Sequence, residues 1–333
     1  LKGYLRFQSV SAQSSSKSSL VACAEWIASH CEGLGLETEI CRTTGNPVVV
    51  ATARGSADSG RCPKVVIYGH YDVQPVDPLN LWTRDPFDPA IEDTEHGPVI
   101  RGRGASDDKG QLMTFVEACR AWKAVHGSLP CRITFFFEGE EESGSPSLVP
   151  FLEDNAAELK ADLALVCDTS MGSRGVPSIA SQLRGMLKDE FTITGPRIDL
   201  HSGHYGGPGL NPLREIARIV ASFHDGDGRV AVEGFYEGVH EVPEELKRQW
   251  QSCGFDEATY LESVGYTRPH GEPGYSTLEQ QWARPTLEVN GLWGGYMGPG
   301  SKTVIPSEAH CKITCRLVGD MDPGRLREKI RAH

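Results

Sequence analysis

Short apolar runs alternate with amphipathic segments along the first half of the chain. The runs are rich in β-branched and aromatic residues and have the length of strands, and several are apolar enough to be buried on both faces. The intervening segments repeat apolar residues at helical spacing. The predicted strands lie at 37–41, 47–52, 64–69, 132–137 and 162–167, and the predicted helices at 16–34, 111–126 and 147–155. This alternation predicts an α/β fold, a mostly parallel sheet with flanking helices.

The pattern changes near residue 182. Later strands are predicted at 187–194, 284–292 and 310–317, with helices at 211–223 and 323–332. The segment 225–283 is polar and weakly periodic. A chain of 333 residues exceeds the usual size of one hydrophobic core. We therefore expect two domains, 1–184 and 185–333, the second a smaller α+β domain with one exposed sheet face.

Two connections in the first half have no predicted helix or strand. Residues 54–61 read as a polar turn. Residues 73–97 form a longer loop rich in proline, with aromatic anchors at Trp82 and Phe87, and a short strand follows at 99–101. Long loops of this kind are usually functional, so we expect it to be ordered beside a site.

Composition excludes several classes of partner. The net charge of −12 argues against nucleic acid or an anionic membrane surface, both of which need clustered lysine and arginine. No apolar run approaches the roughly 20 residues of a membrane span. The ten cysteines form no C-x-x-C pair, and scattered cysteines in apolar runs are typical of reduced core residues. We expect a cytoplasmic protein.

Polar residues that could bind a metal follow the buried strands. His70 and Asp72 follow the strand 64–69, acids at 138–142 follow 132–137, and Asp168 follows 162–167. The carboxyl ends of parallel strands share one sheet edge, where ligands collect. Taken singly, these signals have simpler explanations: a lone histidine is more often a satisfied turn residue, and an acidic run is more often a solvated loop.

Asp107 and Asp108 precede the helix 111–126 and could cap it. Taken together with the other acids, however, they would crowd like charges at one edge, which is unfavourable unless cations lie among them. Histidine and carboxylate ligands suit zinc, with manganese or cobalt as substitutes. Two metals about 3.5–4 Å apart could activate a water for hydrolysis, with Glu141 or Glu142 as general base. A structural metal site and an acidic binding surface remain alternatives.

Three motifs carry a resemblance to a known family. They are GHYDVQP at 69–75, RGASDDKG at 103–110 and EESGS at 141–145. With them the sequence resembles the dinuclear zinc metallopeptidase family that contains carnosinase, cytosolic nonspecific dipeptidase, aminoacylase, carboxypeptidase G and succinyl-diaminopimelate desuccinylase. The first motif continues as DVQP at 72–75, which resembles the form of this motif in the dipeptidase branch of the family.

The resemblance implies a zinc-exopeptidase-like catalytic domain with an inserted lid and dimerisation domain, and two zinc ions per subunit. It also implies a cis peptide bond between Asp107 and Asp108. The implied roles are His70 and Asp168 on the first zinc, Asp107 bridging both, Glu142 on the second zinc, Asp72 orienting His70, and Glu141 as general base.

The second half is similar to the family's lid domain. The motif DLHSG at 199–203 resembles the segment whose histidine, His201 here, reaches the partner subunit's site in a homodimer. Without the family, His201 would be expected only to cap a turn. The segment 302–306, with Thr303, and Arg316 resemble the groups that hold the substrate's terminal carboxylate, for which a guanidinium is well suited.

The chain departs from the family pattern in one respect. The family supplies a further histidine to the second zinc from a Gly-rich segment near its C-terminus, and no later histidine here has that context. We expect that return of the catalytic domain to lie beyond residue 333. The predicted function is zinc-dependent cleavage of dipeptides. The alternatives are deacylation of N-acyl amino acids on the same scaffold and, without catalysis, an inactive metal-binding fragment.

Overall fold

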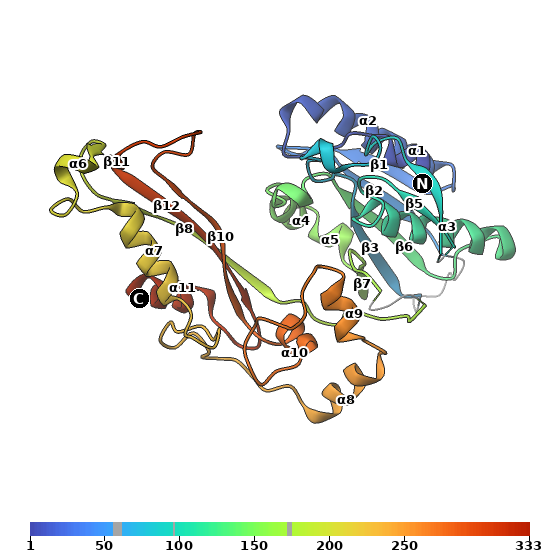
Figure 1. Ribbon diagram of the computed structural model, residues 1–333. Helices are drawn as coiled ribbons and strands as arrows, with labels where there is room; N and C mark the ends of the chain where they lie inside the picture. Colours follow the sequence, from blue (N-terminus) through green and yellow to red (C-terminus); the bar gives the residue numbers. More distant parts are fainter. Residues whose placement is uncertain (56–61, 96, 172–174) are drawn as a thin grey trace. The chain divides into compact units, whose positions relative to one another are not determined.

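The computed structural model describes the chain except for residues 56–61, 96 and 172–174. The chain divides into two compact units, Leu1–Ser170 and Met171–His333, each of which is described by itself (Figure 1). The predicted turn at 54–61 lies mostly outside the described residues.

A five-stranded sheet forms the centre of the first unit. Its order is β1-β2-β6-β3-β7, and β6, β3 and β7 are parallel neighbours while β2 runs antiparallel to both β1 and β6. All strands except β2 therefore point the same way, and the predicted mostly parallel sheet is confirmed. The strands are β1 (Glu37–Cys41), β2 (Val48–Ala53), β3 (Lys64–His70), β6 (Arg132–Glu138) and β7 (Leu163–Val166).

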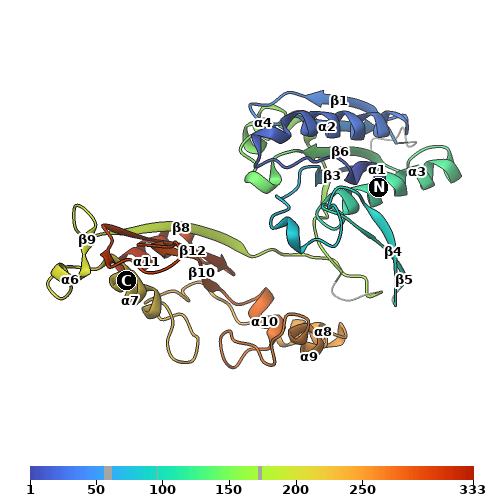
Figure 2. The ribbon, with the colours of Figure 1, turned by 45° about the horizontal axis from the view of Figure 1, so that its top comes forward.

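Helices pack against this sheet and close its core. The helix α2 (Lys17–Glu32) contacts β1 and β2 and runs along them (Figure 2), while α3 (Lys109–His126) contacts β3. Their apolar faces join Phe135 and Phe137 of β6 in one buried cluster. The remaining elements of this unit are α1 (Lys2–Leu5), α4 (Leu148–Asp154), α5 (Ala156–Leu159) and the 3-10 turns η1 (Ser14–Ser16), η2 (Leu79–Leu81) and η3 (Glu141–Ser143).

Two predictions for this unit were wrong. The predicted loop 73–97 contains a strand, β4 (Ala90–Thr94), which pairs with β5 (Gly97–Arg101) in an antiparallel hairpin. The sequence pattern did not predict β4, because the hairpin is only partly buried and its residues are of mixed polarity. The strand β7 was expected to be buried, but Leu163 and Val166 are 53% and 54% exposed. In the described sheet β7 is an edge strand, with β3 as its neighbour.

The second unit is built on a three-stranded antiparallel sheet, in the order β10-β12-β8. Helices α7 (Pro212–Ser222) and α11 (Pro323–Ala332) pack on one face of it (Figure 1). Alternate residues of β12 are buried beneath them, which leaves the other face open, as predicted. The strands are β8 (Gly185–Thr194), β10 (Thr286–Gly294) and β12 (Glu308–Leu317). A smaller pair, β9 (Leu200–His201) and β11 (Val304–Ile305), adjoins α6 (Ser202–Tyr205).

The weakly periodic segment 225–283 contains three short helices that the sequence pattern missed. They are α8 (Glu244–Ser252), α9 (Glu257–Glu262) and α10 (Thr277–Trp282). Helices of nine residues or fewer span less than three turns, so apolar spacing is a weak signal for them. No described helix is long and apolar enough to cross a membrane.

Candidate metal centre

The strand β3 delivers His70 to the edge of the first sheet. Because β3 and β6 are parallel and in register, His70 lies beside Glu138, the last residue of β6. Asp168 follows β7, the neighbour of β3 on its other side. The residues Asp107 and Asp108 come directly before α3. Parallel pairing thus brings residues from distant parts of the chain to one edge, as the sequence predicted.

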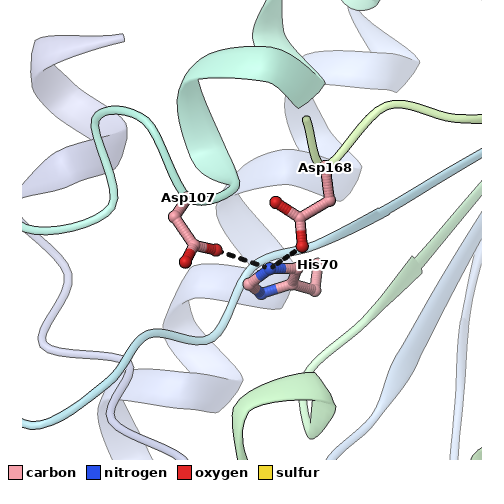
Figure 3. A group of neighbouring side chains, drawn as sticks. All are labelled: His70, Asp107 and Asp168. Carbon is pink, nitrogen blue, oxygen red and sulfur yellow. Dashed lines mark hydrogen bonds and ion pairs between the residues drawn. The ribbon is translucent and has the colours of Figure 1, made fainter. Parts of the chain in front are cut away.

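His70 is fully buried and faces two carboxylates. Its Nε2 lies 3.1 Å from Oδ1 of Asp107 and 3.5 Å from Oδ2 of Asp168. Figure 3 shows both carboxylates pointing at the imidazole, one from the loop that enters α3 and one from the chain beyond β7. One ligand atom from each of the three residues lies within 4.8 Å of the others. The three donors therefore converge on one point.

The imidazole is held in the orientation that a metal ligand needs. Its Nδ1 donates to the backbone carbonyl of Asp72 at 3.1 Å. This bond keeps a proton on Nδ1, so Nε2, the atom facing Asp107 and Asp168, is the ring atom that would bind a metal after giving up its own proton. With a metal bound, the donor set would be one neutral imidazole and two carboxylates, which suits a divalent cation.

Electrostatics also favours a cation at this point. Burial alone would lower the pKa of His70, but hydrogen bonds to Asp168 and Asp72 outweigh it and raise the pKa to about 11. Burial raises the pKa of the neighbouring Asp108 to about 7. Asp108 Oδ2 accepts from the backbone N–H of His70, while its buried Oδ1 has no hydrogen-bond partner among the described atoms. The residues present thus fit a metal ion, which would supply the positive charge that this cluster of acids lacks.

The sequence profile of Peptidase family M20/M25/M40 matches residues 66–312, which include His70, Asp107 and Asp168. The chain belongs to this family. The recognition of a metallopeptidase from its three motifs is thereby confirmed.

Named relatives of this M20 chain include dipeptidases. It is 30% identical over 289 residues to the Cys-Gly metallodipeptidase of Saccharomyces cerevisiae, covering 86% of this chain and 59% of that protein. Among solved structures, an M20 metallo-carboxypeptidase of Sulfolobus solfataricus is 32% identical with a TM-score of 0.86, covering 100% of this chain and 73% of that one. Human carnosine dipeptidase 1 is 26% identical with a TM-score of 0.83, covering 100% and 71%. The chain spans less than two thirds of the yeast relative's length.

In this M20 chain Asp72 links the histidine to the acidic turn. Its carboxylate is fully buried, and Oδ1 lies 3.3 Å from Nδ1 of His70. The same carboxylate accepts the backbone N–H groups of Glu141 at 3.2 Å and Glu142 at 3.1 Å. A single side chain therefore fixes both the ring of His70 and the start of η3.

Glu141 and Glu142 lie on η3 and are partly buried. Oε2 of Glu142 accepts from Nε2 of Gln74 at 2.7 Å. Burial raises the pKa of both carboxyl groups. For Glu141 the nearby charges of Glu142 and Asp168 add to this increase, while His70 opposes it. A carboxylate with a raised pKa is a better proton acceptor near neutral pH. Neither glutamate belongs to the His70, Asp107 and Asp168 group.

Two simpler explanations of the acidic residues are wrong. Asp108 is the N-cap residue of α3, but its side chain makes no capping hydrogen bond and accepts from His70 instead. The run 138–142 is not a solvated loop, because Glu138 and Glu140 are 2% and 6% exposed. Glu140 accepts the backbone N–H of Asn46 at 2.9 Å and of Ser147 at 3.1 Å. Glu138 accepts from the hydroxyl of Ser145 at 3.0 Å, so both glutamates hold the surrounding loops in place.

Sequence reasoning missed Lys109. Its side chain is fully buried, and Nζ donates to the backbone carbonyls of Tyr4 at 3.4 Å and Phe7 at 3.0 Å. It thus ties the N-terminal segment to the start of α3, directly after Asp107 and Asp108. The only available signal was a lysine within an acidic motif, which ordinarily reads as a surface residue.

The candidate residues of the second unit lie on exposed positions. Nδ1 of His201 accepts the backbone N–H of Gly203 at 2.9 Å and so caps α6, as expected without the family. Its Nε2 donates to Oγ1 of Thr303 at 3.2 Å, which pairs two of the predicted residues. Arg316 lies on the open face of β12, away from both.

Proposed function

We propose that this chain carries the metal-binding and lid parts of a zinc-dependent dipeptidase. The observation that carries the proposal is the convergence of His70, Asp107 and Asp168 on one point beside a turn with two glutamates. Membership in the M20 family supports hydrolysis, and the dipeptidase names of its relatives support dipeptides as substrates. Residues 1–184 would be the catalytic part and 185–333 the lid and dimerisation part.

The metal would be held by the residues at the sheet edge. His70 and Asp168 would bind one zinc ion, Asp107 would bridge to a second, and Glu142 would bind that second ion. Manganese or cobalt could replace zinc. Bound zinc would polarise the scissile carbonyl and acidify a water molecule.

The chain's own residues would then handle the proton. Glu141, whose carboxyl pKa is raised by burial, would take a proton from the attacking water and deliver it to the leaving amine. Asp72 would hold both His70 and the backbone of Glu141 in place through the contacts described above. Loss of Asp72 would therefore disturb the metal ligand and the base together.

Residues of the second unit would bind the substrate. Arg316 would form a charge-assisted pair with the terminal carboxylate of the dipeptide, and Thr303 would contact the same end. His201 would act on the site of a second copy of the chain, so we propose a homodimer that pairs through this unit. The free state of all ten cysteines is compatible with the proposed cytoplasmic location.

The test is an assay of this chain against dipeptides and N-acyl amino acids in zinc, manganese or cobalt, with metal content measured in parallel. We expect dipeptide hydrolysis and two metal ions per chain, whereas bound metal without hydrolysis of either substrate class would leave only a metal-binding fragment. The variant Glu141→Gln should lower kcat by about 10²–10⁴-fold, while Glu153→Gln, on an exposed position of α4, should not. Hydrolysis of the acylated substrates alone would replace the dipeptidase proposal with a deacylase, and a fully active Glu141→Gln would remove the proposed base.

A further inference from the structure

The open face of the sheet in the second unit carries a pair of arginines at one end. Cys315 and Leu317 of β12 are buried, so Arg316 between them lies on the opposite, open face. It pairs across the sheet with Met186 on β8 and with Thr286 on β10. Arg316 is therefore flanked on both sides by strand ends.

Arg184 lies next to this position. It directly precedes β8 and comes two residues before Met186, the cross-strand neighbour of Arg316. Its Nη1 donates to the backbone carbonyl of Arg284 at 3.4 Å, which directs the guanidinium toward the start of β10. Arg284 comes two residues before Thr286, the other cross-strand neighbour of Arg316, so the guanidinium of Arg184 lies near Arg316, close enough for the charge of Arg316 to act on it.

Neither guanidinium has an acidic partner among the described residues. In the described parts of the chain no carboxylate lies within 4.0 Å of Arg184 or Arg316, whereas Arg284 nearby is paired with Glu272 at 2.8 Å. The pKa of Arg184 is lowered, first by burial and then by the charge of Arg316, while Glu288 partly opposes this. Two unpaired like charges side by side repel each other, and an anion between them would relieve the repulsion.

We propose that Arg184 and Arg316 together form a binding site for a doubly anionic ligand end, which selects substrates whose C-terminal residue is aspartate or glutamate. Arg316 takes the α-carboxylate, and Arg184 takes the side-chain carboxylate through its planar donor array. This inference rests on the proposed function for the role of Arg316 and deepens it by naming the substrate class. The anion site itself depends only on the two arginines.

Binding of L-glutamate and L-glutamine to the whole chain tests the site by calorimetry. These ligands differ by one charge and contain no peptide bond, so the result does not depend on catalysis. We expect glutamate to bind about tenfold more tightly, the contribution of one charge-assisted contact. Arg184→Gln should remove this preference while leaving glutamine binding unchanged. Arg184→Lys keeps the charge but loses the planar donor array, so it should reduce the preference for glutamate severalfold. It replaces Arg184→Gln as the test if Arg184→Gln does not fold.

The matched control is Arg268→Gln, which removes a charge from an exposed position elsewhere in the same unit and should keep the preference. Equal binding of glutamate and glutamine by the natural chain, or a preference retained in both Arg184 variants, would overturn the proposal.

A second measurement separates this inference from the proposed function. With metal present, the KM for Gly-Glu should lie below that for Gly-Gln, and Arg184→Gln should raise only the former, with little change in kcat. A glutamate preference without any dipeptide hydrolysis would refute the dipeptidase and leave the anion site. Dipeptide hydrolysis without a preference for glutamate would refute the anion site and leave the dipeptidase proposal.

Discussion

Replacing Asp72 with asparagine tests the central claim about the candidate metal centre. The carboxylate of Asp72 is fully buried and accepts two backbone N–H groups, from Glu141 at 3.2 Å and Glu142 at 3.1 Å. Asparagine keeps the shape of the side chain but replaces one acceptor oxygen with a donor. It leaves the backbone carbonyl of residue 72, which accepts from His70, unchanged.

The expected magnitude follows from these contacts. Loss of one charge-assisted hydrogen bond inside the unit should lower the free energy of unfolding by about 1.5–3 kcal/mol. The carboxylate also lies 3.3 Å from Nδ1 of His70, and removal of such a supporting group typically weakens metal binding by about 10–100-fold. Asp72→Asn should therefore reduce both stability and zinc affinity.

Urea denaturation of the metal-free chain and zinc titration with a competing chelator measure the two effects separately. The matched control is Asp154→Asn, which makes the same chemical change at the exposed end of α4. If Asp72→Asn matched the control in both assays, Asp72 would not hold the histidine and the acidic turn together, and the proposed arrangement of the site would be wrong.

Three further predictions follow from the structure. Zinc at about 100 times its dissociation constant should stabilise the natural chain by about 2.7 kcal/mol in thermal melts, and His70→Ala should abolish this shift; a persisting shift would place the metal elsewhere. Phe135→Ala should cost about 3–5 kcal/mol in denaturant unfolding, because Phe135 is fully buried in the first core; a loss below about 1 kcal/mol would contradict that packing. Burial raises the pKa of Glu279, but hydrogen bonds to Ser276 outweigh it and lower the pKa below its usual 4.5. The stabilisation that ionised Glu279 gives the folded chain is therefore present at neutral pH, and it is lost as the pH falls through the pKa of Glu279 in the folded state. Glu279→Gln should then cost about 0.5–2 kcal/mol at pH 7 and much less near pH 3, and an equal loss at both values would exclude the charge as the cause.

The sequence was most informative where a segment is long and buried on a regular period. The strand 64–69 and the helix 111–126 were predicted within two residues of β3 and α3, because their apolar spacing reflects contacts with a core. Prediction failed for β4, α8 and α9, which bury too few side chains to leave a pattern, and for α10, which buries three side chains but is only six residues long. The exposure of Leu163 on β7 also escaped prediction, since an apolar run does not show whether its strand lies at an edge.

The sequence by itself determined which residues could form the metal centre. A histidine or acids follow several of the apolar runs, and these residue types alone indicate metal chemistry. It also determined family membership, because the three motifs lie in the order that the family shares.

Only the tertiary structure decided how these residues act together. It separated the acids into Asp107 and Asp168, which face the same atom of His70, and Glu138 and Glu140, which hold loops. It also brought Arg184 beside Arg316 across a sheet. The sequence shows which charged residues follow one another along the chain. Their burial, hydrogen bonds and distances depend on strand pairing between residues far apart in the chain, and that pairing exists only in the folded protein.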